Sequence, residues 1–201
     1  ELHIAIESNR TQSPGNHDII VSQNSKTFST HRDLSLGPAL GRAVHRSLYL
    51  IDFKNDDQHI QDICKTCAYQ EGIATHINVI VDNVKKALET KLISNLSSNH
   101  YREVPVSGII SGIKYSGFID LLIEENGVYN IVDYKTDLIN AQNPIESKIE
   151  KYSKQLAIYS LLLKQNENIL NTKATILFLS LDENIEYKIS NLDEIYKEIL
   201  A

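Results

Sequence analysis

The chain has 201 residues, of which 42% are hydrophobic and 23% are charged. This is the composition of an ordinary globular domain with one substantial core. The net charge of −6 at pH 7 excludes a protein that binds polyanions through its bulk electrostatics. No apolar run approaches the ~20 residues of a membrane-spanning helix and no signal peptide is visible, so we expect no membrane partner. The chain begins with Glu1 and contains no methionine, and we therefore expect a processed product or a piece of a longer protein.

Residues 1–35 carry few structural signals. Leu2–Ile6 and Asp18–Ser22 could form short strands, but the segments between and after them are polar and rich in turn-forming residues. We expect an N-terminal arm or the remnant of a linker here, and we place the main domain at residues 36–201.

A helix is predicted over Gly37–Phe53, where apolar residues recur along one stripe. Gly37, Gly41 and His45 follow one another at four-residue spacing on an adjoining face. Glycine inside a helix costs about 1 kcal/mol relative to alanine. A close approach of this helix to another element would justify that cost and would let His45 reach a neighbouring surface. The alternative is a histidine satisfied at the edge of the helix.

Two further helices are predicted over Asp57–Tyr69 and Thr75–Leu96, and we expect them to form an additional helical layer. The first contains Cys64 and Cys67, the two cysteines of the chain. Two cysteines cannot complete a four-cysteine zinc or iron–sulfur site. A redox pair is possible, but thiols one helical turn apart favour plain helix residues, and we expect the reducing compartment of the cytoplasm.

A β-hairpin is predicted from Phe118–Glu124 and Val128–Lys135, with Asn126-Gly127 as its two-residue turn. Counting back along the ladder places Asp120 opposite Asp133 on one face, and the period of a strand adds Lys135 to that face. Like charges directly opposite each other are destabilising, and a hard divalent cation between them would remove the repulsion. The alternative is an ordinary solvated strand face.

A third strand is predicted over Tyr101–Ile110, and Pro105 within it indicates an edge or a bulge. A two-residue turn at Ser111-Gly112 would bring Glu103 opposite Asp120, so that three carboxylates lie in a row across three strands. A turn at Lys114–Gly117 would give a different register.

The C-terminal part is predicted to begin with a long helix over Ile145–Gln165, on which Tyr152, Gln155 and Tyr159 share one face. These side chains form either a buried polar seam or a surface that contacts nucleic acid. Two strands and a closing helix are predicted after it, over Thr175–Ser180, Glu186–Ile189 and Leu192–Leu200.

Five segments appear in one order: Leu36–Arg46 with its histidine, Arg102–Pro105, Gly117–Asp120, Val132–Asp137, and the pattern Tyr152-x-x-Gln155-x-x-x-Tyr159. Together they closely resemble the PD-(D/E)xK nucleases, and more specifically the RecB/AddA nuclease domain at the C-terminus of helicase–nuclease subunits. The resemblance implies an α/β fold with a restriction-endonuclease-like mixed central sheet flanked by helices.

The resemblance also implies residue roles. Metal binding is implied for His45, Asp120, Asp133 and the backbone carbonyl of Tyr134, with Mg²⁺ as the cofactor and Mn²⁺ as a plausible substitute. Catalytic roles are implied for Asp120, Asp133, Lys135, Glu103, Gln155 and Tyr159. Lys135 would orient or deprotonate the attacking water or would remain charged, and Gln155 and Tyr159 would support the site and the DNA.

The expected function is that of a Mg²⁺-dependent deoxyribonuclease, which would process DNA ends exonucleolytically during double-strand break repair as part of a helicase–nuclease. The expected partners are single-stranded DNA ends and a helicase domain or partner subunit, because the chain itself carries no helicase motifs. The alternatives are a free-standing Cas4-like nuclease and a catalytically inactive nuclease fold that binds DNA or scaffolds a complex. The acidic net charge leaves DNA capture to partners or to a small groove lined by Lys114, Lys148, Lys151 and Lys154.

Overall fold

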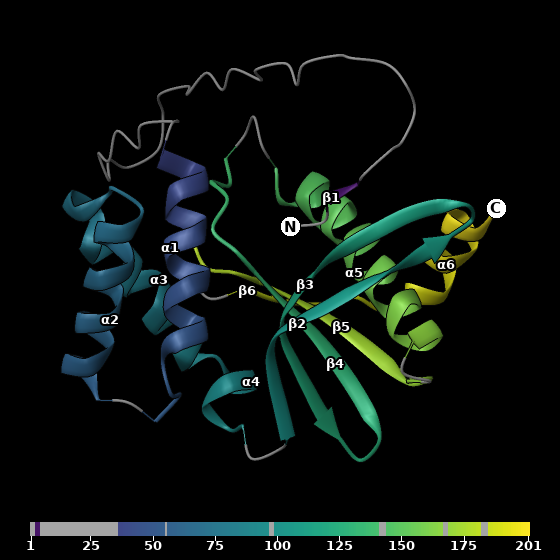
Figure 1. Ribbon diagram of the computed structural model, residues 1–201, viewed down its shortest axis with the longest axis horizontal. Coiled ribbons are helices and arrows are strands. Elements are labelled where there is room, and N and C mark those ends of the chain that lie inside the picture. Colours follow the sequence, from purple (N-terminus) through teal and green to yellow (C-terminus); the bar gives the residue numbers. More distant parts are fainter. Residues whose placement is uncertain are drawn as a thin grey trace.

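A mixed β-sheet forms the centre of the molecule (Figure 1). The computed structural model describes residues 3–4, 36–54, 56–96, 99–140, 144–166, 169–181 and 185–201. Within these residues the sheet has six strands in the order β1-β3-β4-β5-β6, with β2 paired to β3 off this path. β4 and β5 are parallel, and the other pairs are antiparallel. The strands are β1 (His3–Ile4), β2 (Asn99–Ile110), β3 (Ile113–Glu125), β4 (Val128–Lys135), β5 (Thr172–Phe178) and β6 (Ile185–Lys188).

Helices cover both faces of the sheet (Figure 1). One layer contains α1 (Leu36–Leu50), α2 (Asp57–Gln70), the 3₁₀ turn η1 (Ala74–His76), α3 (Ile77–Glu89) and α4 (Lys91–Ser94), and the other contains α5 (Ile145–Asn166) and α6 (Leu192–Leu200). Each layer shares an apolar core with its own face of the sheet. The expected α/β architecture with an additional helical layer is therefore confirmed. No helix among the described residues is long and apolar enough to cross a membrane.

Some predicted boundaries were wrong. Thr75–Leu96 is not one helix, because Thr90 leaves the helical conformation with ψ 144° and its hydroxyl donates to the Ala87 carbonyl at 2.7 Å. Such a local side-chain bond competes with the helical ladder. β5 begins at Thr172 rather than Thr175 and β6 ends at Lys188. The candidate strand at residues 18–22 lies outside the described residues, and the domain boundary at residue 36 stays a prediction.

The β2–β3 hairpin has the register expected from a turn at Ser111-Gly112. Ile110 pairs with Ile113, and both turn residues have positive φ. The alternative turn at Lys114–Gly117 was wrong, because these residues continue β3. Among the described residues β2 pairs with β3 alone, so Pro105 lies on an edge strand as predicted.

In both strands of this hairpin, alternate side chains change from one face of the sheet to the other at a single position. Ile119 packs in the core under α5, whereas Leu121 packs in the core under α1, although alternation would place them on the same face. The paired positions resume on either side of the Glu103–Asp120 position, which is itself absent from the ladder. Glu103 has φ 51°, a value uncommon outside glycine. The hairpin therefore belongs to one core at its tip and to the other at its base.

Arg102 fixes the end of α1 against β2. Its guanidinium donates to the carbonyls of Tyr49 at 3.2 Å and Ile51, and it lies 3.8 Å above the Phe53 ring. The last carbonyls of a helix have no partner within the helix, and a cation there also opposes the negative end of the helix dipole. Arg102 thus attaches the C-terminal end of α1 to β2, next to Glu103.

Replacement of Arg102 by alanine is expected to lower the free energy of unfolding by about 1–3 kcal/mol, because it removes a charged donor from the carbonyls at the end of α1, one of them part-buried. Urea denaturation followed by circular dichroism measures this change. Lys65→Ala, an exposed position on α2, is the control and should stay within about 0.5 kcal/mol of the parent chain. An equally small effect of Arg102→Ala would contradict the role of Arg102.

Cys64 and Cys67 are both free thiols, and each has 0% of its surface exposed in the core under α1. Burial raises the pKa of the Cys64 thiol to about 11. The structure therefore favours plain helix residues over a redox pair.

Cys64 should react with iodoacetamide at pH 8 roughly a hundredfold more slowly in the folded chain than in urea, because the thiolate is the reacting form. Mass spectrometry of the alkylated peptide measures both rates. Equal rates in the two conditions would show that the thiol is accessible in the folded chain.

Candidate active site

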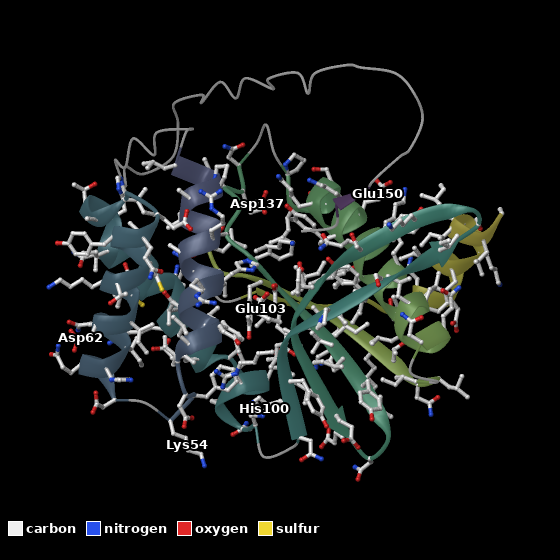
Figure 2. All side chains as sticks on the ribbon, in the orientation of Figure 1. Lys54, Asp62, His100, Glu103, Asp137 and Glu150 are labelled. Atoms are coloured by element: carbon white, nitrogen blue, oxygen red, sulfur yellow. The ribbon has the colours of Figure 1, made fainter. Side chains whose placement is uncertain are left out.

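Three side chains from α1, β2 and β3 converge at the position where the strands of the hairpin change faces. His45 of α1, Glu103 of β2 and Asp120 of β3 each offer one ligand atom, and these atoms lie within 4.8 Å of one another. Figure 2 shows Glu103 between α1 and the hairpin. The register that places Glu103 across from Asp120 is the one predicted from the sequence.

Asp120 connects this cluster to the sheet. Its Oδ1 lies 3.0 Å from His45 Nδ1, and its Oδ2 accepts a 2.8 Å hydrogen bond from the backbone amide of Tyr134. The last backbone pair between β3 and β4 is Leu121–Val132, next to Asp120. Beyond this pair the Asp120 side chain, instead of a backbone carbonyl, bonds to the amide of Tyr134 on β4. Burial alone would raise the pKa of Asp120, but His45, Lys135 and the Tyr134 amide outweigh burial and lower it.

His45 reaches the sheet because α1 approaches it closely. A Cβ at Gly41 would stand 3.4 Å from Thr136 Oγ1, whereas one at Gly37 would meet nothing within 4 Å. The predicted close approach therefore occurs at Gly41 and not at Gly37. Burial alone would lower the pKa of His45, but the adjacent Asp120 carboxylate raises it. Burial and the charge of Asp120 raise the pKa of Glu103.

Asp133 and Lys135 form a second group at the end of β4. Lys135 Nζ lies 2.7 Å from Asp133 Oδ2, and both side chains are more than 90% buried. The ammonium also lies 4.3 Å from the centroid of the Tyr152 ring. Burial alone would lower the pKa of Lys135, but Asp133 and Asp120 raise it. Asp133 is outside the cluster of three ligand atoms.

Asp137 anchors α5 to the end of β4. It accepts hydrogen bonds from Lys148 Nζ at 2.7 Å and from the Tyr152 hydroxyl at 2.6 Å, and these partners lower its pKa although burial alone would raise it. In the view of Figure 2 the Asp137 label lies beside the N-terminal end of α1. Because the Tyr152 ring also covers Lys135, this anchor fixes one wall of the Lys135 environment.

Gln155 and Tyr159 lie in the interior and form part of a buried polar seam. Gln155 Nε2 donates to the Tyr159 hydroxyl at 3.2 Å, and Tyr159 has 0% of its surface exposed. Burial raises the pKa of Tyr159 well above its usual value, so the phenol is protonated at neutral pH. Gly117 makes this position possible, since a Cβ there would stand 2.9 Å from Tyr159 Cε1.

The donor set suits a divalent cation. One imidazole nitrogen and two carboxylates lie within the span of a single coordination sphere, a combination compatible with Mg²⁺ and more so with Mn²⁺. Asp133 Oδ2 is buried without a hydrogen bond of acceptable geometry, although Lys135 is close to it. A buried carboxylate oxygen in this state is suited to an additional positive partner.

Comparison of the whole chain with known families decides its membership. The model of the PD-(D/E)XK nuclease superfamily matches residues 23–199. The chain belongs to this superfamily. The restriction-endonuclease-like mixed α/β fold expected for it is the fold that the structure has.

Two further comparisons give similar proteins. The chain is 35% identical over 185 residues to an ATP-dependent helicase/nuclease subunit of Clostridioides difficile (strain 630), in a match that covers 78% of this chain and 14% of that protein. The chain therefore spans about one seventh of the length of this relative. A solved structure described as "Crystal structure of SSO0001" matches with 15% identity and a TM-score of 0.38, over 84% of this chain and 86% of that chain.

The fold brings the residues that the PD-(D/E)XK resemblance singled out into three contacting groups: His45, Glu103 and Asp120; Asp133 and Lys135; and Gln155 and Tyr159. The observed pairs between β3 and β4 have the predicted register, which places Asp120 across from Asp133. The Asp133 carboxylate, however, is ion-paired with Lys135 and is not part of the first group. The backbone carbonyl of Tyr134 stays a predicted ligand.

Three contributors to this candidate site had no role in the sequence analysis. Arg102, Asp137 and Gly117 were part of matching segments, but the helix end, the Tyr152 hydroxyl and the Tyr159 ring that they contact are distant in sequence. Only the spacing of Asp137, two residues after Lys135, placed it near the predicted site.

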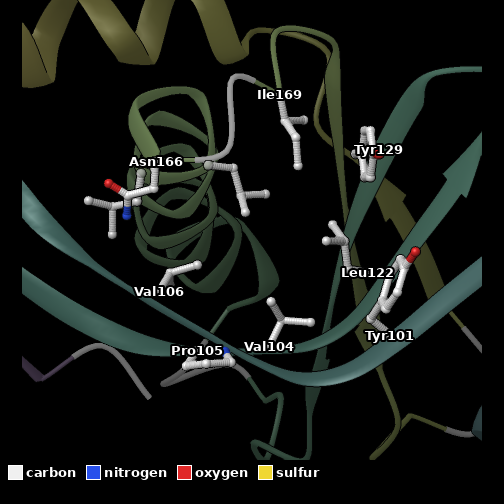
Figure 3. Close-up of a pocket in the computed structure, with 10 residues that line it drawn as sticks. Tyr101, Val104, Pro105, Val106, Leu122, Tyr129, Asn166 and Ile169 are labelled. Carbon is white, nitrogen blue, oxygen red and sulfur yellow. The ribbon is translucent and has the colours of Figure 1, made fainter.

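A hollow of about 230 Å³ lies elsewhere, between the sheet and the C-terminal end of α5 (Figure 3). Its lining is mostly apolar and includes Tyr101, Val104, Leu122 and Tyr129. None of the acidic residues described above lines it. The candidate site is therefore identified by its cluster of ligand atoms and not by this hollow.

Gly117→Ala is expected to destabilise the chain by about 1–3 kcal/mol, because the added methyl group overlaps the Tyr159 ring. The cost should fall when Tyr159→Phe removes the hydroxyl in the same chain, and urea denaturation of the two single variants and the double variant measures the coupling. Gly37→Ala is the control and should not destabilise, since that position is open. Equal costs of Gly117→Ala in both backgrounds would exclude the contact with the Tyr159 hydroxyl as its origin.

Proposed function

We propose that the domain hydrolyses phosphodiester bonds of DNA with a divalent cation and processes DNA ends as the nuclease part of a helicase–nuclease. The observation that supports this most directly is the convergence of His45, Glu103 and Asp120 within 4.8 Å, beside a lysine that is ion-paired with Asp133. A nuclease needs a cation site and a positive group next to each other, and these two groups supply both.

His45, Glu103 and Asp120 would hold the cation, with Asp133 and the Tyr134 carbonyl as further ligands on the adjoining strand. Mg²⁺ is the expected ion, and Mn²⁺ is the expected substitute because an imidazole is part of the set. A divalent cation at this position supplies Lewis-acid polarisation of a phosphate and hydroxide near neutral pH.

Lys135 is the positive group that the chain itself provides. The carboxylate of Asp133 and the ring of Tyr152 hold its ammonium in one place, and a fixed donor needs no reorganisation when charge develops on a phosphate. Gln155 and Tyr159 support the hairpin from the α5 side of the sheet, because Tyr159 packs directly against Gly117 of β3.

The role in end processing rests on the helicase/nuclease relative. The similarity covers most of this chain but a small part of that protein, which agrees with a nuclease module joined to, or associated with, a helicase. The net charge of −6 gives the module little attraction for DNA by itself, and a helicase partner would deliver the unwound strand to it.

Asp120→Ala and Lys135→Ala should each reduce Mg²⁺-dependent degradation of linear single-stranded DNA by about 10²- to 10³-fold or more, because each removes a preorganised charge. Gel electrophoresis of end-labelled DNA measures the rate, and circular dichroism checks the fold. Asp120→Asn repeats the test with a side chain that keeps its shape. Asp193→Ala and Lys197→Ala, exposed residues of α6, are the matched acidic and basic controls and should retain full activity.

A comparison of linear with covalently closed circular single-stranded DNA tests the exonuclease part of the proposal. Cleavage of the circular form would make the domain an endonuclease. Absence of cleavage by the parent chain with Mg²⁺ and with Mn²⁺ would instead support an inactive nuclease fold that binds DNA or scaffolds a complex.

A further inference from the structure

We infer that Phe118 and Pro105 form a stacking platform for an unpaired base of the strand that the site cleaves. This inference rests on the proposed function and adds to it a preference for single-stranded substrate at a named position. The two residues pair directly across the hairpin, and both side chains are exposed, Phe118 by 53%.

The alternation of the hairpin places this pair on the face of the acidic cluster. The inward positions of β3 are identified by their contacts: Ile119 packs in the α5 core, and a Cβ at Gly117 would meet Tyr159 of α5. Phe118 and Asp120 alternate with these inward positions and therefore point the other way. Asp120 contacts His45 on that side, so the Phe118 ring lies on the side of the cluster.

The same relation holds on β2, where Val106 packs in the α5 core and Glu103 belongs to the acidic cluster. The Phe118–Pro105 pair is thus the next outward cross-strand pair after Asp120 and Glu103. Two residues along a strand correspond to about 7 Å. A base on the platform and the phosphate at the cluster can therefore belong to the same or adjoining nucleotides.

The platform is rigid in the backbone and apolar on its surface. Both chain neighbours of Phe118 pack against the α5 layer, Gly117 over the buried Tyr159 and Ile119 in the apolar core, and Pro105 restricts the backbone of the opposite strand. Farther along this outward face are the Ser107–Ser116 pair and the Ile109–Lys114 pair. The face therefore combines an aromatic ring near the cluster with hydroxyl groups and one lysine beyond it.

A stacked base explains how an acidic domain can hold DNA. Stacking on an aromatic side chain contributes affinity that does not depend on positive charge and accepts any base. A base within a duplex is already stacked on its neighbours, so the platform selects unpaired nucleotides. Stacking should also be far less sensitive to salt than phosphate contacts are.

Phe118→Ala is expected to raise KM for a linear single-stranded oligonucleotide by roughly 5- to 100-fold, with a much smaller change in kcat. Phe118→Trp should restore KM. Tyr101→Ala is the matched control: Tyr101 is an aromatic residue of the same hairpin, 51% exposed, but it lines the hollow on the other side of β2 (Figure 3). It should leave KM unchanged.

A substrate with one abasic site, moved nucleotide by nucleotide along the strand, separates stacking from other effects. In the parent chain one position of the abasic site should raise KM by about as much as Phe118→Ala does, and in Phe118→Ala the same lesion should add nothing. An unchanged KM for Phe118→Ala, or equal effects of the lesion in both chains, would overturn the inference.

Equilibrium binding of the same fluorescent oligonucleotide, measured by anisotropy at two salt concentrations, separates this inference from the proposed function. Weaker binding of Phe118→Ala at both salt concentrations supports the platform even if the parent chain cleaves no DNA. Equal binding of the two chains overturns the platform while leaving the nuclease activity intact.

Discussion

The pair of contacts that Asp120 makes, to the imidazole of His45 and to the backbone amide of Tyr134, is the constraint on which the rest of the site depends. One oxygen holds the helical layer, and the other replaces a ladder bond where β3 and β4 separate. Because a buried carboxylate is costly without partners, both contacts stabilise Asp120 in the folded chain. The same side chain therefore joins the α1 layer to the sheet and belongs to the cluster that could hold a cation.

The two strands of the hairpin change faces directly beside this carboxylate, since Ile119 packs in one core and Leu121 in the other. Glu103 adopts a positive φ at the corresponding position of β2, and the strained conformation occurs at the residue that faces His45 and Asp120, which is where functional sites commonly store strain. Arg102 fixes the adjacent end of α1, and Gly117 admits Tyr159 from α5. Elements from both layers thus determine where three ligand atoms meet.

The charges of the site are balanced within it. Lys135 and Asp133 neutralise each other in the interior, and Asp137 does the same for Lys148 at the start of α5. This balance allows a domain of net charge −6 to keep a concentrated set of ionised groups in its centre.

The sequence by itself determined the register of the β3–β4 hairpin, because Asn126-Gly127 specifies a two-residue turn and the period of a strand then fixes which residues align. For the β2–β3 hairpin it left two turns open, and the structure decided for Ser111-Gly112. The sequence also determined the family, through short segments whose order is informative although each is weak alone. Only the tertiary structure decided that Asp133 pairs with Lys135 rather than with the Asp120 cluster, that Arg102 ends α1, and that β2 and β3 change faces at Glu103 and Asp120. These features depend on contacts between residues far apart in the chain, which local periodicity does not encode.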